Sequence, residues 1–223
     1  MQNAIGGLIT SDLKPEAYIL YPDEGHAYER KENWISLFAA ECGSVANSNL
    51  PTYMSMSKSM QALELRKTEE RDLDYVLAVE HSDENRLFVI PWSREQHIQA
   101  LVDPDVAHLI VTAQTKVGYV ILAGLLGPNQ SIELRRIVIS EKGKGYGSAA
   151  VEMLKELVFK TYQAHRLWLD VKVQNQRARG IYEAAGFVTE GTLRECLHTK
   201  NGFDSLVIMS MLRQEYDESK KRE

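Results

Sequence analysis

One segment governs the interpretation of this chain: Lys142-Gly143-Lys144-Gly145-Tyr146-Gly147. It lies between a strand-like run, residues 131–139, and a helical pattern that begins at Tyr146 and continues to about Tyr162. Glycines let a backbone approach an anion closely, and the first turn of a helix offers free N–H groups at the positive end of its dipole. The segment therefore predicts a loop whose amides hold phosphate, with a plain connecting turn as the alternative.

Two other phosphate-binding loops fit the segment less well. A P-loop needs Gly-Lys followed by Ser or Thr, whereas Gly145-Tyr146 stands where Lys-Ser would be required. A dinucleotide-binding loop reads Gly-x-Gly-x-x-Gly, with an acid about 20 residues later. Here the spacing from Gly145 to Gly147 is too short, although Asp170 does end the next strand. A dinucleotide oxidoreductase stays an alternative, but antiparallel strands precede the loop where that fold needs a parallel unit.

Outward from the loop, a regular series of strand and helix patterns begins at Leu63. Thr68 and Ser93 are the predicted N-caps of the first two helices. We expect strands at about 63–67, 107–113, 116–125, 131–139, 166–171, 187–193 and 203–211, and helices at about 68–79, 93–102, 146–162 and 175–186. This order predicts an α/β (α+β) fold with a mixed, mostly antiparallel sheet flanked by helices.

The chain divides into three parts by composition. Residues 1–61 form an N-terminal extension broken by Pro15, Pro22 and Pro51. One helix is expected there at 25–42, with the remainder helical or disordered, and its residues indicate no function. Residues 62–213 carry the regular pattern and are the predicted domain. Residues 214–223 are predicted to be a charged C-terminal tail.

The bulk properties are those of an ordinary globular protein of 223 residues with a net charge of -5. This charge argues against a nucleic-acid partner. No apolar run approaches the roughly 18 residues that span a bilayer, and no signal peptide is apparent, so we expect a cytoplasmic protein without a membrane partner. Cys42 and Cys196 are isolated, which suits a reducing compartment, and no cysteines or histidines have metal-ligand spacing. We expect no metal.

Two motifs together resemble those of a known family. Ile137-Val138-Ile139 and the glycine segment resemble the coenzyme A motif of the GNAT superfamily, the Gcn5-related N-acetyltransferases, written Arg/Gln-x-x-Gly-x-Gly/Ala. Lys142 replaces the usual Arg or Gln and keeps the charge of Arg. The family's second motif is matched by Asn175, then Tyr182, then Gly186-Phe187. The resemblance covers about residues 62–213 and looks closest to the branch with the ribosomal-protein and diamine acetyltransferases.

The resemblance implies a GNAT-like fold with acetyl-CoA as co-substrate. Backbone groups of Ile137, Val138 and Ile139 would pair with the pantetheine arm, and Asn175 would contact the cofactor. Tyr182 would lie beside the thioester sulfur, where a phenol can protonate the leaving thiolate. Packing on a helix face is the alternative for this tyrosine. The loop amides that would hold the diphosphate belong to Lys142, Gly143, Lys144, Gly145, Tyr146, Gly147 and Ser148.

The attacking amine must lose a proton, because an alkylammonium with a pKa of about 10.4 is not a nucleophile at neutral pH. Glu133, on the strand before the loop, matches the place where several family members carry a catalytic Glu. The alternative is a carboxylate paired with Arg135, which shares its strand face and would make it a poorer base. Arg136 is expected on the other face. The polar loop Asp83-Glu84-Asn85 is a candidate for contacting a cationic acceptor, with a solvated turn as the alternative.

We therefore expect an N-acetyltransferase that moves acetyl from acetyl-CoA to a primary amine, either a small polyamine-like molecule or a protein N-terminus. Direct attack is favoured because Cys196, the cysteine of the matched region, lies after the last motif. The alternative is a non-catalytic acyl-CoA sensor that acts through residues 1–61. A homodimer is left open as a further expectation.

Overall fold

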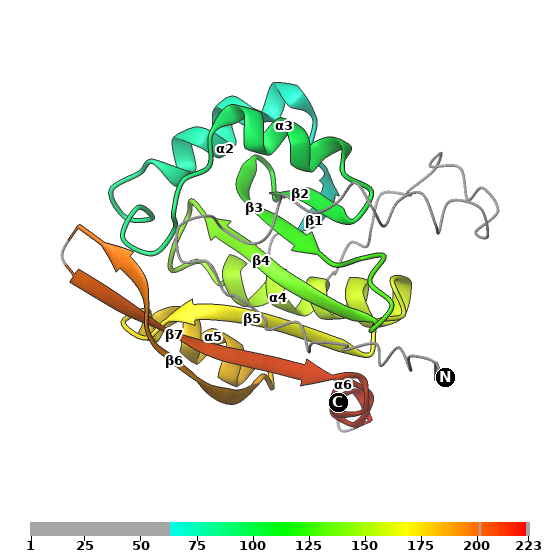
Figure 1. Cartoon of the computed structure of the whole chain (residues 1–223). Helices are drawn as coiled ribbons and strands as arrows, with labels where there is room; N and C mark the ends of the chain where they lie inside the picture. Colours follow the sequence, from blue (N-terminus) through cyan, green and yellow to red (C-terminus); the bar gives the residue numbers. More distant parts are fainter. Residues whose placement is uncertain (1–62, 201, 222–223) are drawn as a thin grey trace, which may run out of the picture. The chain divides into compact units, whose positions relative to one another are not determined.

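The computed structural model describes residues 63–200 and 202–221 (Figure 1). The N-terminal extension and its expected helix at 25–42 lie outside this part of the chain. The described strands are β1 (Glu64–Lys67), β2 (Val106–Thr112), β3 (Lys116–Ala123), β4 (Ser131–Ile139), β5 (Arg166–Lys172), β6 (Val188–Thr199) and β7 (Gly202–Leu212). The helices are η1 (Glu70–Asp72), α2 (Leu73–Glu80), α3 (Arg94–Val102), α4 (Tyr146–Glu156), η2 (Leu157–Thr161), α5 (Gln176–Ala184) and α6 (Arg213–Lys220).

The strands form one seven-stranded sheet in the order β1-β2-β3-β4-β5-β7-β6. Every pairing is antiparallel except that of β4 with β5, which is parallel. Parallel neighbours need a crossover, and α4 with η2 supplies it on the way from β4 to β5. The predicted mixed and mostly antiparallel sheet is confirmed.

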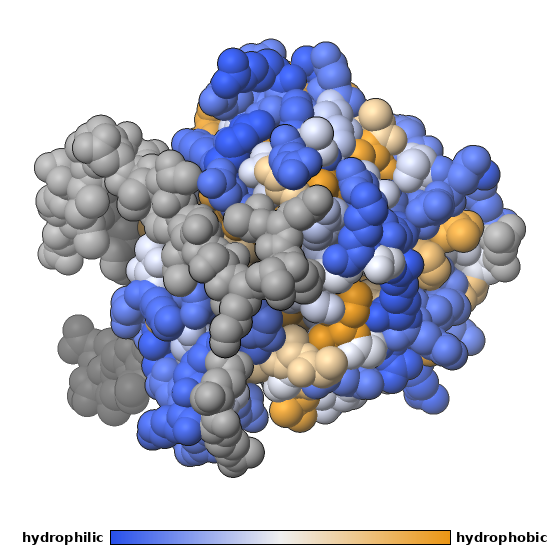
Figure 2. Space-filling view, turned by 180° about the vertical axis from the view of Figure 1, so that it is seen from behind, coloured by the Kyte–Doolittle hydropathy of each residue, from blue (hydrophilic) through white to orange (hydrophobic). Residues whose placement is uncertain are grey.

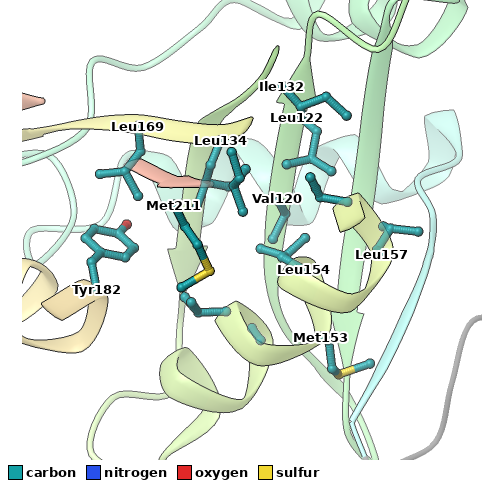
Figure 3. Close-up of a cluster of buried hydrophobic side chains, with 14 of the residues drawn as sticks. Val120, Leu122, Ile132, Leu134, Met153, Leu154, Leu157, Leu169, Tyr182 and Met211 are labelled. Atoms are coloured by element: carbon teal, nitrogen blue, oxygen red, sulfur yellow. The ribbon is translucent and has the colours of Figure 1, made fainter. Parts of the chain in front are cut away.

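Two apolar cores cover the two faces of the sheet. The larger packs α4, η2 and α5 against the central strands and includes Leu122, Leu134 and Leu169 (Figure 3). The smaller packs Val76 and Val79 of α2 against β2, β3 and β4. Figure 1 shows α2 and α3 beside the β1–β3 half of the sheet and α4 behind β4 and β5. Viewed from behind, the described surface is mostly hydrophilic with separate hydrophobic patches (Figure 2).

A β-bulge interrupts β4 before the glycine loop. On β3, Ile121 pairs with Arg136 and the next residue pairs with Leu134, so Arg135 is the extra residue. Leu134 and Ile137 both pack against the larger core although they differ by an odd number of positions. Glu133 and Arg136 therefore share the opposite face. The prediction that Arg136 points away from the face of Glu133 is wrong, because strict alternation does not survive a bulge.

Two local predictions have different outcomes at the helix starts. Ser93 caps α3 as predicted, accepting a hydrogen bond from the Gln96 amide at 3.3 Å within a capping box. Thr68 is not a cap: Glu69 takes that position at η1. Thr68 is instead buried, with its hydroxyl 2.9 Å from Nδ1 of His108.

The end of the chain is more ordered than its composition suggested. Residues expected as a charged tail form α6, whose Tyr216 is buried and stacks on Phe159 with ring centroids 4.9 Å apart. Phe159 belongs to η2, a π-helical turn that ends the predicted helix at 146–162, with the Tyr162 amide donating to Leu157. One aromatic contact thus holds an otherwise polar helix against the body.

Candidate active site

The glycine loop has the backbone geometry that its sequence predicted. Gly143 and Gly145 adopt φ values of 82° and 79°, in the left-handed region that side chains disfavour. Gly145 is the N-cap of α4, and Ala149 donates to its carbonyl at 3.1 Å. The amides of this first turn precede the first hydrogen bond of the helix, so no carbonyl within α4 is placed to accept from them. Loop and helix start therefore fit a diphosphate through backbone groups.

The lysines of the loop are engaged with protein groups. Nζ of Lys144 lies 2.7 Å from a carboxylate oxygen of Glu141 in the same loop. Nζ of Lys142 donates to Oδ1 of Asn85 at 2.6 Å, on the connection between α2 and α3. The positive charges of the two lysine side chains are therefore already balanced in part by neighbouring protein groups.

The strand before the loop has an open edge. Pairing of β4 with β5 runs from Ser131↔Arg166 to Glu133↔Trp168, and no further pair joins them among the described residues. Beyond this point Ile137, Val138 and Ile139 pair with β3 on their other edge. Backbone groups on an unpaired strand edge need partners. The separation of β4 from β5 therefore places hydrogen-bonding backbone where a chain of amides could lie.

Helix α5 brings the second motif to the same region. Asn175 caps this helix, with its Oδ1 accepting from the Ala178 amide at 3.2 Å. The predicted start of this helix is confirmed. A Cβ on Gly147 would stand 3.5 Å from the side chain of Ile181, so α5 approaches the first turn of α4.

Tyr182 lies beside Ile181 and is 6% exposed. Figure 3 shows its ring beside Leu169 and Met211, with the hydroxyl directed toward the strands. Burial raises the pKa of Tyr182, and the negative charge of Asp170 raises it further. The phenol therefore keeps its proton at neutral pH, the state that a proton or hydrogen-bond donor requires. The packing role considered for this side chain and a donor role are both compatible with this position.

Glu133 has the partner that was considered as the alternative to catalysis. Its Oε2 accepts from Nε of Arg135 at 3.1 Å and from Nη2 at 2.9 Å. The Glu133 side chain is 9% exposed and the Arg135 side chain 19%. The carboxylate is therefore half of a largely buried ion pair. It lies on the face of the sheet opposite the larger core, the face covered by α2.

A buried polar cluster close to Glu133 was not found by sequence reasoning. Glu80, at the end of α2, is fully buried and accepts from the Tyr119 hydroxyl, from Nη1 of Arg136 and, at 2.9 Å, from the Trp92 amide. Arg136 also donates to the Ile90 carbonyl at 2.8 Å and lies over the Trp92 ring, 4.6 Å from its centroid. The available signal was Glu80 itself, one helical turn after the core residue Val76.

The cluster continues into two buried histidines. Burial alone would raise the pKa of Glu80, but His97, Arg136 and its other hydrogen-bond donors outweigh burial and hold that pKa at about 2. Nδ1 of His97 lies 3.0 Å from Nε2 of His108. Burial, with the nearby His97, lowers the pKa of His108 to about 3. His108 is therefore a buried core residue of β2 that stays uncharged at neutral pH.

No group of three or more His, Cys, Asp and Glu side chains among the described residues is placed to hold a metal ion. Among the helices described, none combines the length and apolar character needed to cross a bilayer.

The loop, the open edge of β4 and the buried tyrosine belong to a mixed α/β fold whose geometry fits an elongated phosphate-containing molecule. Residues 62–188 match the family described as Acetyltransferase (GNAT) domain, and the chain belongs to this family of acetyltransferases. The predicted family is confirmed, and with it the prediction of an acetyltransferase.

Two of the relatives are named for different amine acceptors. The chain is 29% identical over 153 residues to a putative ribosomal protein bS18-alanine N-acetyltransferase of Bacillus subtilis, covering 65% of this chain and 92% of that protein. It is 25% identical over 171 residues to the spermidine N(1)-acetyltransferase of Escherichia coli K12, covering 71% and 90%. A crystal structure of the Vibrio cholerae spermidine N-acetyltransferase with CoA and spermine has the same fold, with a TM-score of 0.64, 24% identity and coverage of 69% and 97%.

Proposed function

We propose that this protein transfers the acetyl group of acetyl-CoA to a primary amine by direct attack. The observation that carries the proposal is the arrangement of the glycine loop and the first turn of α4 at the end of a strand whose β5-facing edge is open. Helix α5 packs beside that loop and supplies Tyr182. The named activities of the relatives, with spermidine and with a ribosomal-protein alanine, support an amine acceptor.

The residues present fit the cofactor through their backbone. The amides of 142–148 would hold the diphosphate, because positive φ at Gly143 and Gly145 turns the loop around a concave row of N–H groups. Backbone groups of 137–139 would pair with the pantetheine amides. Asn175 would add a side-chain contact from the start of α5. Bound there, acetyl-CoA would supply an activated acyl carbon at the opening between β4 and β5.

In the proposed reaction the amine nitrogen bonds to the acyl carbon and the carbon–sulfur bond breaks. Tyr182 donates a hydrogen bond or proton toward the departing sulfur, a role that its protonated state permits. The proton of the amine passes to Glu133, directly or through water. Glu133 performs this role only if substrate binding loosens its pair with Arg135, because a carboxylate held by a guanidinium is a weak base.

The acceptor is proposed as a primary amine of either class predicted from the sequence, a polyamine-like molecule or a protein N-terminus. We also propose a cytoplasmic location, because the isolated cysteines suit a reducing compartment. A homodimer stays a prediction. The Vibrio cholerae spermidine N-acetyltransferase has a structure described as dodecameric, so measurement of mass in solution is the direct test of assembly.

A thiol-release assay with acetyl-CoA tests the activity against a panel of polyamines and N-terminal peptides. We expect acceptor-dependent thiol release and a product heavier by one acetyl group. Thiol release that is no faster with any acceptor than without one would refute the proposal. Tight CoA binding without turnover would instead favour the acyl-CoA sensor.

The variant Tyr182→Phe separates catalysis from binding in the same assay. Loss of a positioned proton donor lowers rates by about 100-fold or more, so kcat should fall while the Kd for CoA stays within about twofold. Phenylalanine fills the same apolar site and preserves the fold. An unchanged kcat would remove Tyr182 from the chemistry and leave it a packing residue.

A further inference from the structure

The side chain of Lys142 points away from the loop in which it stands. Its Nζ donates to Oδ1 of Asn85 at 2.6 Å and to the Glu84 carbonyl at 3.4 Å, and lies 3.5 Å from the Glu84 carboxylate. The Lys142 side chain is 28% exposed. These three oxygens surround the ammonium from the side of the α2–α3 connection. Lys144, in contrast, reaches only a carboxylate of its own loop in the described residues.

Asn85 is a rigid receptor for this ammonium. It is 6% exposed, and its Nδ2 donates to the Val79 carbonyl at 2.9 Å near the end of α2. That bond orients the side-chain amide so that Oδ1 faces Lys142. The Asn85 carbonyl accepts from the amides of Phe88 and Val89, at 2.8 and 2.9 Å. The segment that follows is therefore folded around Asn85.

Residues 82–92, called here the bridging segment, contact both strands where β4 and β5 separate. Arg136 of β4 donates to the Ile90 carbonyl at 2.8 Å. Lys172 of β5 donates to the Leu87 carbonyl at 3.1 Å. With Lys142, three cationic side chains from the loop and from both strands hold the backbone and the asparagine of one segment. The bridging segment thus spans the opening on the face that carries Glu133.

We propose that Lys142 is a positioning residue whose side chain ties the bridging segment to the cofactor loop, and that its ammonium group is not a ligand of the cofactor diphosphate. The inference rests on the proposed function, because it assigns the bridging segment to the wall of the amine site. Binding of CoA fixes the loop, and Lys142 transmits that order to the bridging segment. The affinity for the amine therefore depends on a side chain of the cofactor loop.

The test compares Lys142→Met with the matched control Lys160→Met in the full chain. Lys160 forms a similar pair with Glu156 at 3.0 Å but lies in η2, away from the site. Methionine keeps the aliphatic chain and removes the charge. Lys142→Met should raise the KM for the amine about tenfold, because a charge-assisted bond is lost, with kcat and the Kd for CoA within about twofold. Lys160→Met should change none of the three values.

A second variant checks that the effect passes through the pair. Asn85→Ala should reproduce the rise in amine KM, and the double variant should be no worse than either single one. Independent, multiplying effects would overturn the proposal. So would a Kd for CoA that rises about tenfold in Lys142→Met while the amine KM is unchanged, since that result makes Lys142 a phosphate ligand.

Hydrogen exchange distinguishes failure of this proposal from failure of the proposed function. CoA should slow the exchange of amides in the bridging segment of the wild-type protein, and much less in Lys142→Met. This readout needs no turnover and no amine. Equal slowing in both proteins would overturn the role of Lys142, whereas absent turnover with the expected exchange difference would reject only the enzymatic assignment.

Discussion

Replacing the buried carboxylate of Glu80 should test how the polar cluster contributes to stability. The substitution Glu80→Gln keeps the shape but removes the charge that Arg136, Tyr119 and the Trp92 amide share. Removing one partner of a buried ion pair costs about 3–5 kcal/mol. The fall of the Glu80 pKa from 4.5 to about 2 corresponds to about 3 kcal/mol. Both values are a large part of an ordinary free energy of unfolding, about 5–15 kcal/mol.

Urea unfolding at pH 7, followed by tryptophan fluorescence, measures the loss. For an m-value of about 2 kcal/mol/M, Glu80→Gln should lower the midpoint by about 1.5–2.5 M with the slope unchanged. The control is Asp83→Asn, whose side chain is 87% exposed and pairs with Arg86 at 3.1 Å. An exposed pair contributes less than about 1 kcal/mol. A loss of that small size in Glu80→Gln would refute the reasoning.

The pH dependence supplies a second check on the same substitution. The pKa of Glu80 is lower in the folded protein than in the unfolded chain. Its stabilisation is therefore fully present above about pH 4.5 and is lost as the pH falls toward 2. The difference between the wild-type protein and Glu80→Gln should shrink over that interval. A difference that stays constant down to the acid limit would contradict the charge-based explanation.

Three further predictions follow from single contacts. Burial holds the pKa of His108 at about 3, so this histidine takes up a proton in the unfolded chain at a higher pH than in the folded protein. The free energy of unfolding should therefore fall as the pH is lowered from 6.5 to 4, and it should fall less in His108→Gln. Gly145 has a φ of 79°, so Gly145→Ala should lower the free energy of unfolding by about 1–2 kcal/mol. The same variant should bind CoA more weakly, as measured by calorimetry. Tyr216→Ala should cost about 3 kcal/mol in urea unfolding by releasing α6 from Phe159. A stability that does not change with pH would refute the prediction for His108, and an unchanged CoA affinity would refute that for Gly145→Ala. An unchanged unfolding midpoint would refute that for Tyr216→Ala.

The features that the sequence predicted well are those in which interacting residues are close along the chain. Ser93 and Gln96 form a capping box across one helical turn, and Asn175 caps α5 through the Ala178 amide. Gly143 and Gly145 have the positive φ values that their residue type permits. Both ends of β4 were predicted correctly, because a polar run precedes the strand and the glycine loop follows it.

The features that the sequence did not predict depend on contacts between residues that lie far apart in the chain. Helix α6 was taken for a tail because its residues are almost all polar, and its anchor, Phe159, lies in another helix. Glu80 meets Tyr119 and Arg136, which are 39 and 56 positions away. Many acceptors are equally compatible with an arginine or a tyrosine until folding selects one.

Amino-acid type and short-range spacing were sufficient to predict the glycine turn before α4, since its backbone geometry needs no particular partner side chain. The sequence did not predict the direction in which the Lys142 side chain points. Lys142 turns toward Asn85, 57 positions earlier, because the sheet brings the end of α2 beside the loop. Likewise the bulge at Arg135 turns Arg136 onto the face of Glu133. Long-range packing selects among rotamers and registers that are locally equivalent, so it alone decided which charged groups surround the proposed amine site.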